Sequence, residues 1–404
     1  MNIKYYDMVI VGAGIVGLSL AASFRNSNLK VALVDRKNIL LNKLHNNSDV
    51  VALNRASRNV LKNIGVNKDF IESSWSPYSN MFITNQDYTS KINFDTDKIL
   101  DVSLGYIVNK IELEKELTLV VEKSSNIDIF EEKENKSILN RDKEVWLSFE
   151  SGEYLVSKLI VGADGGNSWV RGQLKIPTVE QDYDQFALTC DVLVEHSHNN
   201  TASQFFLSTG PLALLPKSNP KSYSIVWTLT PELARSYENL SKDEFHKKLL
   251  SASNGFVGKI LGSTNIRIRP LKMICAQQFI KDNAVLVGDA AHVFHPLAGL
   301  GVNLGIQDIA SLNEVINQCI EQGTAINDAK HLRHFERWRK SEAIKLISML
   351  KVINDIFKGK NKIVNFFTKA GLFLIDNNSF IKNFFVKKAL QVDFKPPKLS
   401  KKSE

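Results

Sequence analysis

The chain has 404 residues, too many for one ordinary core, which indicates two domains or one domain with a large insertion. Its 44% hydrophobic and 23% charged residues predict a globular protein and exclude a disordered one. The three cysteines, Cys190, Cys275 and Cys319, are far apart, which excludes a disulfide framework or a cysteine zinc site and fits a reducing compartment.

The net charge of +8 is concentrated near the C-terminus. Residues 333–404 hold 17 Lys or Arg and 6 Asp or Glu, a net of +11, so the rest of the chain carries −3. No recognition motif accompanies this charge, so nucleic acid is not an expected partner. We find neither a signal peptide nor a run of about 18 apolar residues that could span a membrane. We therefore expect a cytoplasmic protein, with peripheral contact to the inner membrane as an open alternative.

The N-terminal stretch predicts a dinucleotide-binding unit. The apolar run DMVIV is typical of a buried parallel strand, and GAGIVG, a helical stretch and the strand KVALVD follow it. Gly12 permits a tight turn, Gly14 lets a pyrophosphate reach the amides of a helix N-terminus, and Gly17 lets helix and strand pack closely. Asp35 ends the second strand, where it can accept both ribose hydroxyls of an adenosine. It would repel the 2′-phosphate of NADP, but the motif leaves FAD and NAD open.

Two stretches in the middle of the chain are less specific. Residues 122–144 are polar and charged, and we expect a solvated hairpin loop there. Residues 154–171, YLVSKLIVGADGGNSWVR, again form an apolar strand that ends in an acid and a glycine, Asp164 and Gly165. This signal is weak alone, but its order relative to the other motifs favours a shared cofactor site.

Residues 181–280 contain alternating stretches, such as QFALTCDVLVE and SYSIVWTLT, that predict antiparallel strands. One face of such a sheet can form an apolar substrate pocket. Candidate lining residues are Phe205, Phe206, Leu212, Leu214 and Trp227, although ordinary sheet core is the default interpretation of each one. His196 and His198 have no carboxylate or thiol set around them, so we expect no metal site.

Residues 284–305, AVLVGDAAHVFHPLAGLGVNLG, place a strand before Gly288 and Asp289, then a glycine-rich loop and a helix over about 303–321 that Gly323 ends. A carboxylate at a strand end suits the hydroxyls of a polyol such as a ribityl chain. The loop and the helix dipole would face a flat group that gains negative charge, as reduced flavin does at its N1/C2-oxygen edge. Together with the N-terminal motif, this predicts one extended ligand held at both ends, FAD.

These motifs together resemble the single-component FAD-dependent aromatic monooxygenases, the group of para-hydroxybenzoate hydroxylase. The stretches YDQFAL, TASQFFLSTGPLALLP and SIVWTL are similar to the UbiH/UbiF-type ubiquinone-biosynthesis hydroxylases. The motifs and the resemblance predict an α/β fold (α+β overall): a Rossmann-like FAD-binding domain, an inserted antiparallel-sheet substrate domain and C-terminal helices. The expected boundaries are 1–75, 98–180 and 281–345 for the FAD-binding domain, 76–97 and 181–280 for the substrate domain, and 346–404 for the basic C-terminal helical segment.

The resemblance implies non-covalent FAD, with NADPH or another reductant as co-substrate. The implied reaction is hydroxylation of the ring of a polyprenyl phenol or benzoquinol in ubiquinone biosynthesis, through a flavin C4a-hydroperoxide. The implied flavin-ring loop contains Pro296, Gly299 and Gly301, with no side-chain acid or base assigned. The implied cofactor contacts are Gly12, Gly14, Gly17, Asp35, Arg36, Asp164, Gly165, Gly288, Asp289, Leu300, Val302 and Asn303. The implied partners are a polyprenylated substrate, the membrane surface and a ubiquinone-biosynthesis complex.

Two positions depart from this family. Asp49 stands in DVVAL where the family has Arg, and Leu300 stands where its loop has Gln. Arg55 or Arg58, one or two helical turns later, is a hypothetical substitute for the missing Arg. Two alternatives stay open. One is a hydroxylase of a small soluble aromatic compound, which would favour polar or basic carboxylate-binding residues that GPLALLP does not offer. The other is a flavin-binding subunit with little activity of its own, which the departures at Asp49 and Leu300 suggest.

Overall fold

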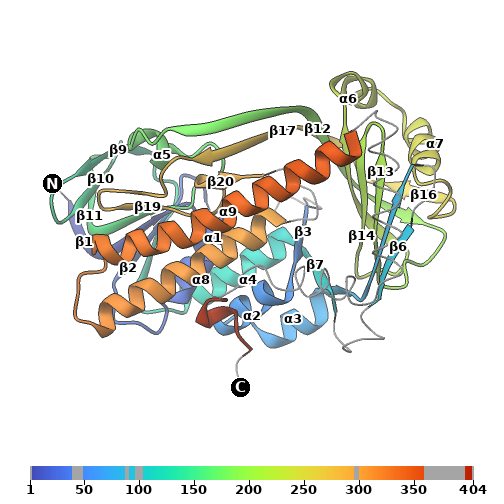
Figure 1. The fold of residues 1–404 in the computed structure, drawn as a ribbon. Helices are drawn as coiled ribbons and strands as arrows, with labels where there is room; N and C mark the ends of the chain where they lie inside the picture. Colours follow the sequence, from blue (N-terminus) through green and yellow to red (C-terminus); the bar gives the residue numbers. More distant parts are fainter. Residues whose placement is uncertain are drawn as a thin grey trace.

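The computed structural model of the protein describes residues 2–38, 49–86, 91–95, 103–294, 300–358 and 396–402. Two large sheets lie at opposite ends of the molecule, and the long strands β12 (Thr178–Val194) and β17 (Arg267–Ala276) run from one end to the other (Figure 1). The predicted loop residues Pro296 and Gly299 lie outside the described residues, as do residues 359–395 of the basic tail.

The first large sheet is mainly parallel. Its order is β18-β19-β11-β1-β2-β8, and β10 and β9 extend it beside β11. The strands are β1 (Ile3–Val11), β2 (Val31–Val34), β8 (Ile127–Phe130), β9 (Asn135–Asn140), β10 (Val145–Phe149), β11 (Tyr154–Gly162), β18 (Ile280–Lys281) and β19 (Ala284–Leu286). Strands β8, β2, β1, β11 and β19 run parallel to one another, whereas β10 and β18 are antiparallel to β11 and β19. The expected hairpin loop at 122–144 is therefore wrong in part, because β8 is an edge strand of this sheet.

Both faces of the parallel sheet are covered, which explains the continuous apolar runs of its strands. Met8 and Ile10 face a core that includes residues of α1 (Ile15–Ser23), α4 (Lys110–Glu122) and α8 (Leu300–Glu321). Val9 and Val11 face a second core, which contains residues of β10, the short helix α5 (Trp169–Gln173) and the end of β17. The predicted α/β class is confirmed.

The second large sheet has the order β20-β17-β12-β15-β14-β13-β5-β6, with β16 beside β12. Its further strands are β5 (Asn80–Asn85), β6 (Lys91–Asp95), β13 (Thr201–Leu207), β14 (Gly210–Pro216), β15 (Ser222–Leu229), β16 (Ile260–Ser263) and β20 (His292–Val293). Most neighbours are antiparallel, but β5 and β13 run parallel. Helices α6 (Pro231–Glu238) and α7 (Lys242–Ala252) pack on one face and enclose its core. We call this unit the nine-stranded sheet.

A third, small sheet contains β3 (Val50–Leu53), β7 (Gly105–Asn109) and β4 (Ser76–Tyr78). Helices α2 (Arg55–Asn63) and α3 (Lys68–Ser74) lie in the chain between β3 and β4. Strand β4 therefore pairs outside the nine-stranded sheet, although it falls in the range expected for the substrate domain. The division into domains stays a prediction.

Helix α8 begins three residues before the expected start. It ends at Glu321, and Gly323 follows with φ +67°, which agrees with the predicted stop. Helix α9 (Ala329–Lys358) continues unbroken across residue 346, where a separate C-terminal segment was expected. No helix of the described ranges is long and apolar enough to cross a bilayer.

The last described residues dock on α2 and α8, near the end of the chain marked in Figure 1. Asn63 Nδ2 donates to the carbonyl of Leu399 at 2.8 Å, and Ser400 Oγ donates to Gln307 Oε1 at 2.6 Å in the interior. Leu399 itself packs against the core beneath the parallel sheet. The short turn Lys398–Ser400 thus joins two helices that both begin near the candidate site.

Candidate cofactor site and active site

Four of the sequence-predicted turns meet at one edge of the parallel sheet. Strand β1 lies between β2 and β11, β19 lies beside β11, and the carboxyl ends of all four are in register. The residues that follow these ends include Gly12, Asp35, Asp164 and Gly288. Ligands of open α/β sheets bind at this edge, outside the carboxyl ends of parallel strands.

The glycine turn after β1 leaves no room for side chains. Gly12 has φ +107°, and a Cβ there would lie 2.4 Å from the carbonyl oxygen of Ala163. A Cβ on Gly17 would lie 1.8 Å from the carbonyl oxygen of Gly12. Gly14 is the N-cap of α1 and offers no side-chain cap, so the first-turn amides of this helix face the edge without one.

Asp35 braces this turn. Its Oδ2 accepts from the amide of Ala13 at 2.7 Å, and its Oδ1 accepts from the amide of Lys37 at 2.9 Å. A carboxylate has about four lone-pair sites, so a contact to ribose hydroxyls is compatible with both bonds. The neighbouring Arg36 side chain is exposed. Both residues remain predicted cofactor contacts.

Asp164 and Arg171 organise the turn after β11. Asp164 Oδ2 accepts from the amide of Val170 at 3.0 Å, whereas its Oδ1 is buried without a partner. Arg171 donates to the carbonyls of Gly166 at 2.7 Å and Ala290 at 2.8 Å, which ties this turn to the turn after β19. Gly165, with φ +84°, supplies the left-handed conformation that the turn needs.

Asp289 lies in the turn that follows β19. Its side chain is open to solvent, yet protein atoms crowd its carboxyl group. This desolvation raises its pKa, against the opposing effect of His292 and of Lys110 at the start of α4. Lys110 is thus a cation near this turn that the sequence motifs missed, and its ammonium lies 3.9 Å from Glu114 Oε1 of the same helix.

The start of α8 carries three further predicted residues. Gly301 and Val302 are half-buried in its first turn. Asn303 is buried and joins α8 to the junction of β3 and α2, because its Oδ1 accepts from the amide of Asn54 at 2.9 Å and its Nδ2 donates to the carbonyl of Ala52 at 2.7 Å. In the structure its amide group fixes the position of the helix start. The side chain of Leu300 lies outside the described residues.

The departure at Asp49 has a structural counterpart on the nine-stranded sheet. Asp49 Oδ1 pairs with Arg267 Nη2 of β17 at 2.8 Å, and the two side chains are 28% and 26% exposed. The guanidinium of Arg58 lies 5.2 Å from the ring centre of Tyr106, and its Nε is buried without a partner. Whether Arg58 or Arg55 replaces the family's Arg stays a prediction.

The candidate lining residues separate onto two faces of the nine-stranded sheet. Four of them are buried in the core that α6 and α7 cover, namely Phe205, Leu212, Leu214 and Trp227. The ring of Trp227, for example, packs edge-on at 5.3 Å from Tyr237 of α6. The default interpretation, sheet core, is therefore correct for these four.

The opposite face of this sheet points toward the parallel sheet. Phe206 packs there against the core that contains β10 and α5, and Arg267 reaches Asp49 from it. Ala213, Val226 and Thr189 are cross-strand partners on this face, in line with Arg267, and all three are half-buried. Alternation along the strands could have separated the two faces, but the sequence does not show which face the helices cover.

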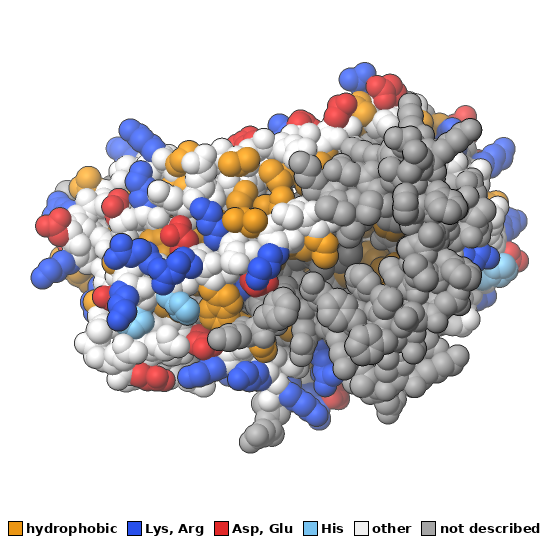
Figure 2. Space-filling view, in the orientation of Figure 1, with side chains coloured by type: hydrophobic (Ala, Val, Ile, Leu, Met, Phe, Trp, Pro, Cys, Tyr) orange, Lys and Arg blue, Asp and Glu red, His pale blue; other side chains and the backbone are white. Residues whose placement is uncertain are grey.

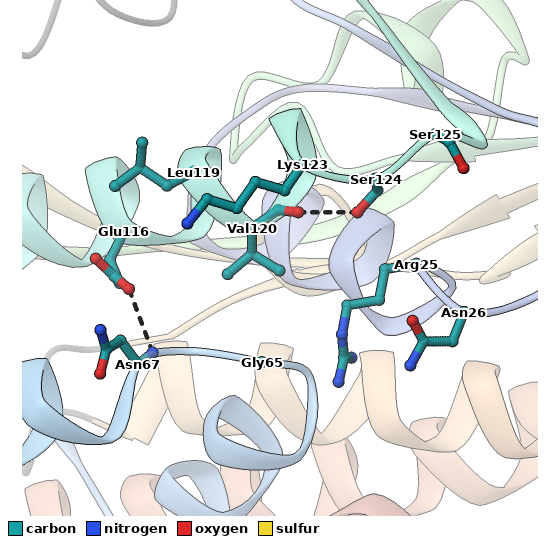
Figure 3. A pocket seen from close by; sticks show the side chains of 10 residues that line it. All are labelled: Arg25, Asn26, Gly65, Asn67, Glu116, Leu119, Val120, Lys123, Ser124 and Ser125. Atoms are coloured by element: carbon teal, nitrogen blue, oxygen red, sulfur yellow. Dashed lines mark hydrogen bonds between the residues drawn. The ribbon is translucent and has the colours of Figure 1, made fainter.

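A groove of about 530 Å³ lies elsewhere, between the C-terminal end of α1, the loop after α2 and α4 (Figure 3). Arg25 borders it, but its guanidinium donates to the carbonyls of Ala22 and Asn63. Because this groove is at the end of α1 away from Gly14, it is distinct from the cofactor edge.

His198 has a local role in a loop. Its Nε2 lies 2.8 Å from the carbonyl oxygen of Lys217, and its Nδ1 accepts from the amide of Asn200. His196 is exposed. The described ranges hold no cluster of three or more His, Cys, Asp or Glu that could bind a metal ion.

Comparison with known proteins identifies the family. The model of the FAD binding domain, FAD_binding_3, matches residues 5–345. The chain belongs to this family. The resemblance inferred from the motifs is thereby confirmed.

Curated relatives of this FAD-binding protein span most of its length. Ubiquinone biosynthesis monooxygenase COQ6 of Dictyostelium discoideum is 27% identical over 448 residues, which cover 94% of this chain and 90% of that protein. Ubiquinone hydroxylase UbiM of Neisseria meningitidis is 26% identical over 388 residues, which cover 93% and 82%. Among solved structures, p-nitrophenol 4-monooxygenase PnpA from Pseudomonas putida matches with a TM-score of 0.79 at 17% identity, covering 96% of this chain and 99% of that one. At that identity the likeness shows the fold alone.

The residues at the cofactor edge fit FAD. A buried Asp164 oxygen has no protein partner, the first-turn amides of α1 have no side-chain cap, and the Asp289 carboxyl is desolvated. Each is a polar group that a ligand with phosphates and hydroxyls would satisfy. A buried cluster beside them, Asp308 with His292 and Arg339, was missed. Its sequence signal is a charged residue on the apolar face of each of two helices.

Proposed function

We propose that this protein is a FAD-dependent monooxygenase that hydroxylates the ring of a polyprenyl phenol or benzoquinol in ubiquinone biosynthesis. The observation that carries this proposal is that the turns after β1, β2, β11 and β19 meet at one edge of the parallel sheet. The half-buried face of the nine-stranded sheet points toward this sheet. Membership of the FAD binding domain family supports the cofactor. The similarity to COQ6, a ubiquinone biosynthesis monooxygenase, and to UbiM, a ubiquinone hydroxylase, supports the substrate class.

FAD, when bound, supplies the reaction of reduced flavin with O₂ and the oxygen atom that reaches the ring. The first-turn amides of α1 would balance the charge of the pyrophosphate. Asp35 would accept from the ribose hydroxyls and Asp289 from those of the ribityl chain. The amides near Gly301, at the start of α8, would stabilise negative charge on the flavin ring.

The half-buried face of the nine-stranded sheet is the proposed substrate surface. Ala213, Val226 and Thr189 present small, uncharged side chains there. The guanidinium of Arg267 at the end of this row is paired with Asp49. Such a surface suits a neutral ring with an apolar chain.

NADPH is the proposed reductant, and one assay tests the function. The purified protein with FAD is given NADPH, and NADPH oxidation, hydroxylated product and hydrogen peroxide are measured with a short-chain polyprenyl phenol or with 4-hydroxybenzoate. Product formed from the prenylated phenol supports the proposal. Product formed only from the small acid supports a soluble substrate, and failure of flavin reduction under every condition supports a non-catalytic subunit. Deletion of the gene, followed by mass spectrometry of quinone precursors, identifies the ring position.

Peripheral membrane contact is proposed for α9, because an apolar polyprenyl substrate resides in the bilayer. Ile344 and Met349 on this helix are 50% and 44% exposed, and Figure 2 shows hydrophobic side chains gathered on the face that α9 crosses. We expect Ile344→Glu with Met349→Glu to reduce co-sedimentation with anionic vesicles. Ile320→Glu on α8, at a similarly exposed apolar residue, is the matched control. Equal sedimentation of the two variants would contradict the membrane contact.

A further inference from the structure

A buried carboxylate on α8 connects three separate parts of the chain. Asp308 Oδ2 accepts from the amide of Gly288 at 2.9 Å and lies 2.7 Å from His292 Nε2. Its Oδ1 accepts from Arg339 Nε of α9 at 2.7 Å. Asp308, His292 and Arg339 are each at most 1% exposed. Helices α8 and α9, which carry Asp308 and Arg339, pack side by side (Figure 1).

The charges in this cluster are compensated. Burial alone would raise the pKa of Asp308, but His292, Arg339 and their hydrogen bonds hold it below its usual value. The carboxylate is therefore ionised, and it receives the Nε2 proton of His292. The Nδ1 of His292 is buried and has no hydrogen-bond partner in the protein, so the ring is held through its Nε2 alone.

The same oxygen fixes both ends of the turn that carries Asp289. Gly288 precedes Asp289 directly, and His292 follows three residues later as the first residue of β20. With Oδ2 bonded to both, the backbone between them has little freedom to rotate the Asp289 carboxyl away from the cofactor edge. The ring of His292 also stacks on the ring of Phe294, with the ring centres 5.0 Å apart. Phe294 directly precedes the residues of the predicted flavin loop.

We propose that Asp308 is a positioning residue for the cofactor: it holds the Gly288–His292 turn in the geometry that the ribityl chain and flavin ring of FAD require, and Arg339 fixes its carboxylate from α9. This inference rests on the proposed FAD site. Asp308 itself touches neither substrate nor cofactor. Its contribution is to pre-organise the turn whose amides and Asp289 carboxyl would contact the cofactor.

The test must separate an effect on FAD binding from a general loss of stability. Any single substitution of Asp308 would leave the charge of Arg339 buried and uncompensated, and this would destabilise the whole protein. We therefore compare two double variants that both remove the ion pair. Asp308→Asn with Arg339→Met keeps an acceptor for the Gly288 amide, and Asp308→Leu with Arg339→Met does not. FAD affinity of each apoprotein is measured by quenching of flavin fluorescence, and the flavin reduction potential is measured alongside.

We expect the Leu double variant to bind FAD about tenfold more weakly than the Asn double variant, which is the equivalent of one lost hydrogen bond. Its reduction potential should shift as well. Asn313→Ala, also on α8 but bonded to Ser23 away from the turn, should leave FAD affinity unchanged. Equal affinities and potentials for the two double variants would overturn the proposal, since a purely structural role changes only the melting temperature.

If either double variant does not fold, His292→Gln and His292→Leu on the intact ion pair provide the same contrast. Gln keeps a donor toward Asp308, and Leu does not. Weaker FAD binding by Leu alone supports the proposal, and equal binding overturns it. The unaltered protein separates the two levels of inference: if it binds no FAD, the proposed function fails, whereas normal binding with equal variants removes only the role of Asp308.

Discussion

The cofactor edge and the nine-stranded sheet differ in how their sites are constructed. At the cofactor edge, each turn follows a strand directly, and main-chain atoms approach so closely that a Cβ on Gly17 would lie 1.8 Å from a carbonyl oxygen. On the sheet, the proposed surface consists of ordinary side chains such as Ala213 and Val226, whose neighbours come from different strands. The first site depends on backbone geometry, and the second depends on which face remains uncovered.

This difference implies different tolerance to substitution. A turn that needs glycine fails with a single added methyl group, whereas a sheet face accepts many side chains and changes only its shape. Substitutions at the edge should therefore affect folding and FAD binding together. Substitutions on the sheet should affect either stability or substrate binding, according to the face.

The largest expected effect is at the edge. Gly17→Ala places its Cβ within 1.8 Å of the Gly12 carbonyl oxygen, so the turn must move or the protein must fail to fold. We expect loss of bound FAD and at least about 3 kcal/mol of lost stability, the scale of severe overpacking. Flavin absorbance after purification and thermal unfolding measure both. Gly172→Ala, with nothing within 4 Å of the added methyl group, is the control and should keep its flavin.

The same contrast explains what the sequence could predict. The strand, glycine turn, helix and acid around Gly12 and Asp35 are contiguous, so their spacing already contains the geometry. The turns at Asp164 and Gly288 follow apolar strands in the same way, and parallel strands bring such ends to one edge. Lys110 was missed because it starts a helix without any motif. Asp308 was missed because its partners are up to 31 residues away in the chain.

The sheet was less predictable for a physical reason. Alternation identified its strands, but the two faces of each strand are equally apolar in stretches such as GPLALLP. Helices α6 and α7 decide which face becomes core, and their packing is a tertiary fact. The prediction of a loop at 122–144 was wrong in part for a similar reason. The short strand IDIF pairs with β2 at the edge of the parallel sheet despite its charged neighbours.

The second prediction compares substitutions on the two faces of the nine-stranded sheet. Trp227→Ala empties a core site, and we expect a loss of about 3–5 kcal/mol in stability with an unchanged KM. Ala213→Trp, on the opposite face, should leave the melting temperature nearly unchanged. Steric overlap of about 1–3 kcal/mol with the substrate would raise its KM roughly ten- to a hundredfold. If Trp227→Ala raised KM instead, the assignment of the faces would be wrong.

A smaller effect is expected at Asp289, where binding and stability oppose each other. Its raised pKa means that the folded protein prefers the neutral carboxyl, so the charged form costs stability once the pH exceeds the unfolded value of about 4. Asp289→Asn should therefore stabilise the apoprotein at pH 7, and this gain should vanish as the pH falls below 4. FAD affinity should drop about tenfold through loss of an acceptor. Thermal unfolding at both pH values and FAD titration measure the two parts, and a less stable variant at pH 7 would contradict the desolvation.

The smallest effect concerns Asp49 and Arg267, the ion pair that joins the start of the small sheet to the nine-stranded sheet. Because both side chains are about a quarter exposed, a double-mutant cycle with Asp49→Ala and Arg267→Ala should give a coupling of at most about 1 kcal/mol, weaker at high salt. Asp49→Arg restores the residue that the family resemblance suggests but places two guanidinium groups together. We expect it to lower stability slightly without improving FAD retention, and adding Arg267→Asp should recover the loss. Improved retention by Asp49→Arg alone would mean that the family's Arg acts on the cofactor here too, and that the pairing across the sheets is secondary.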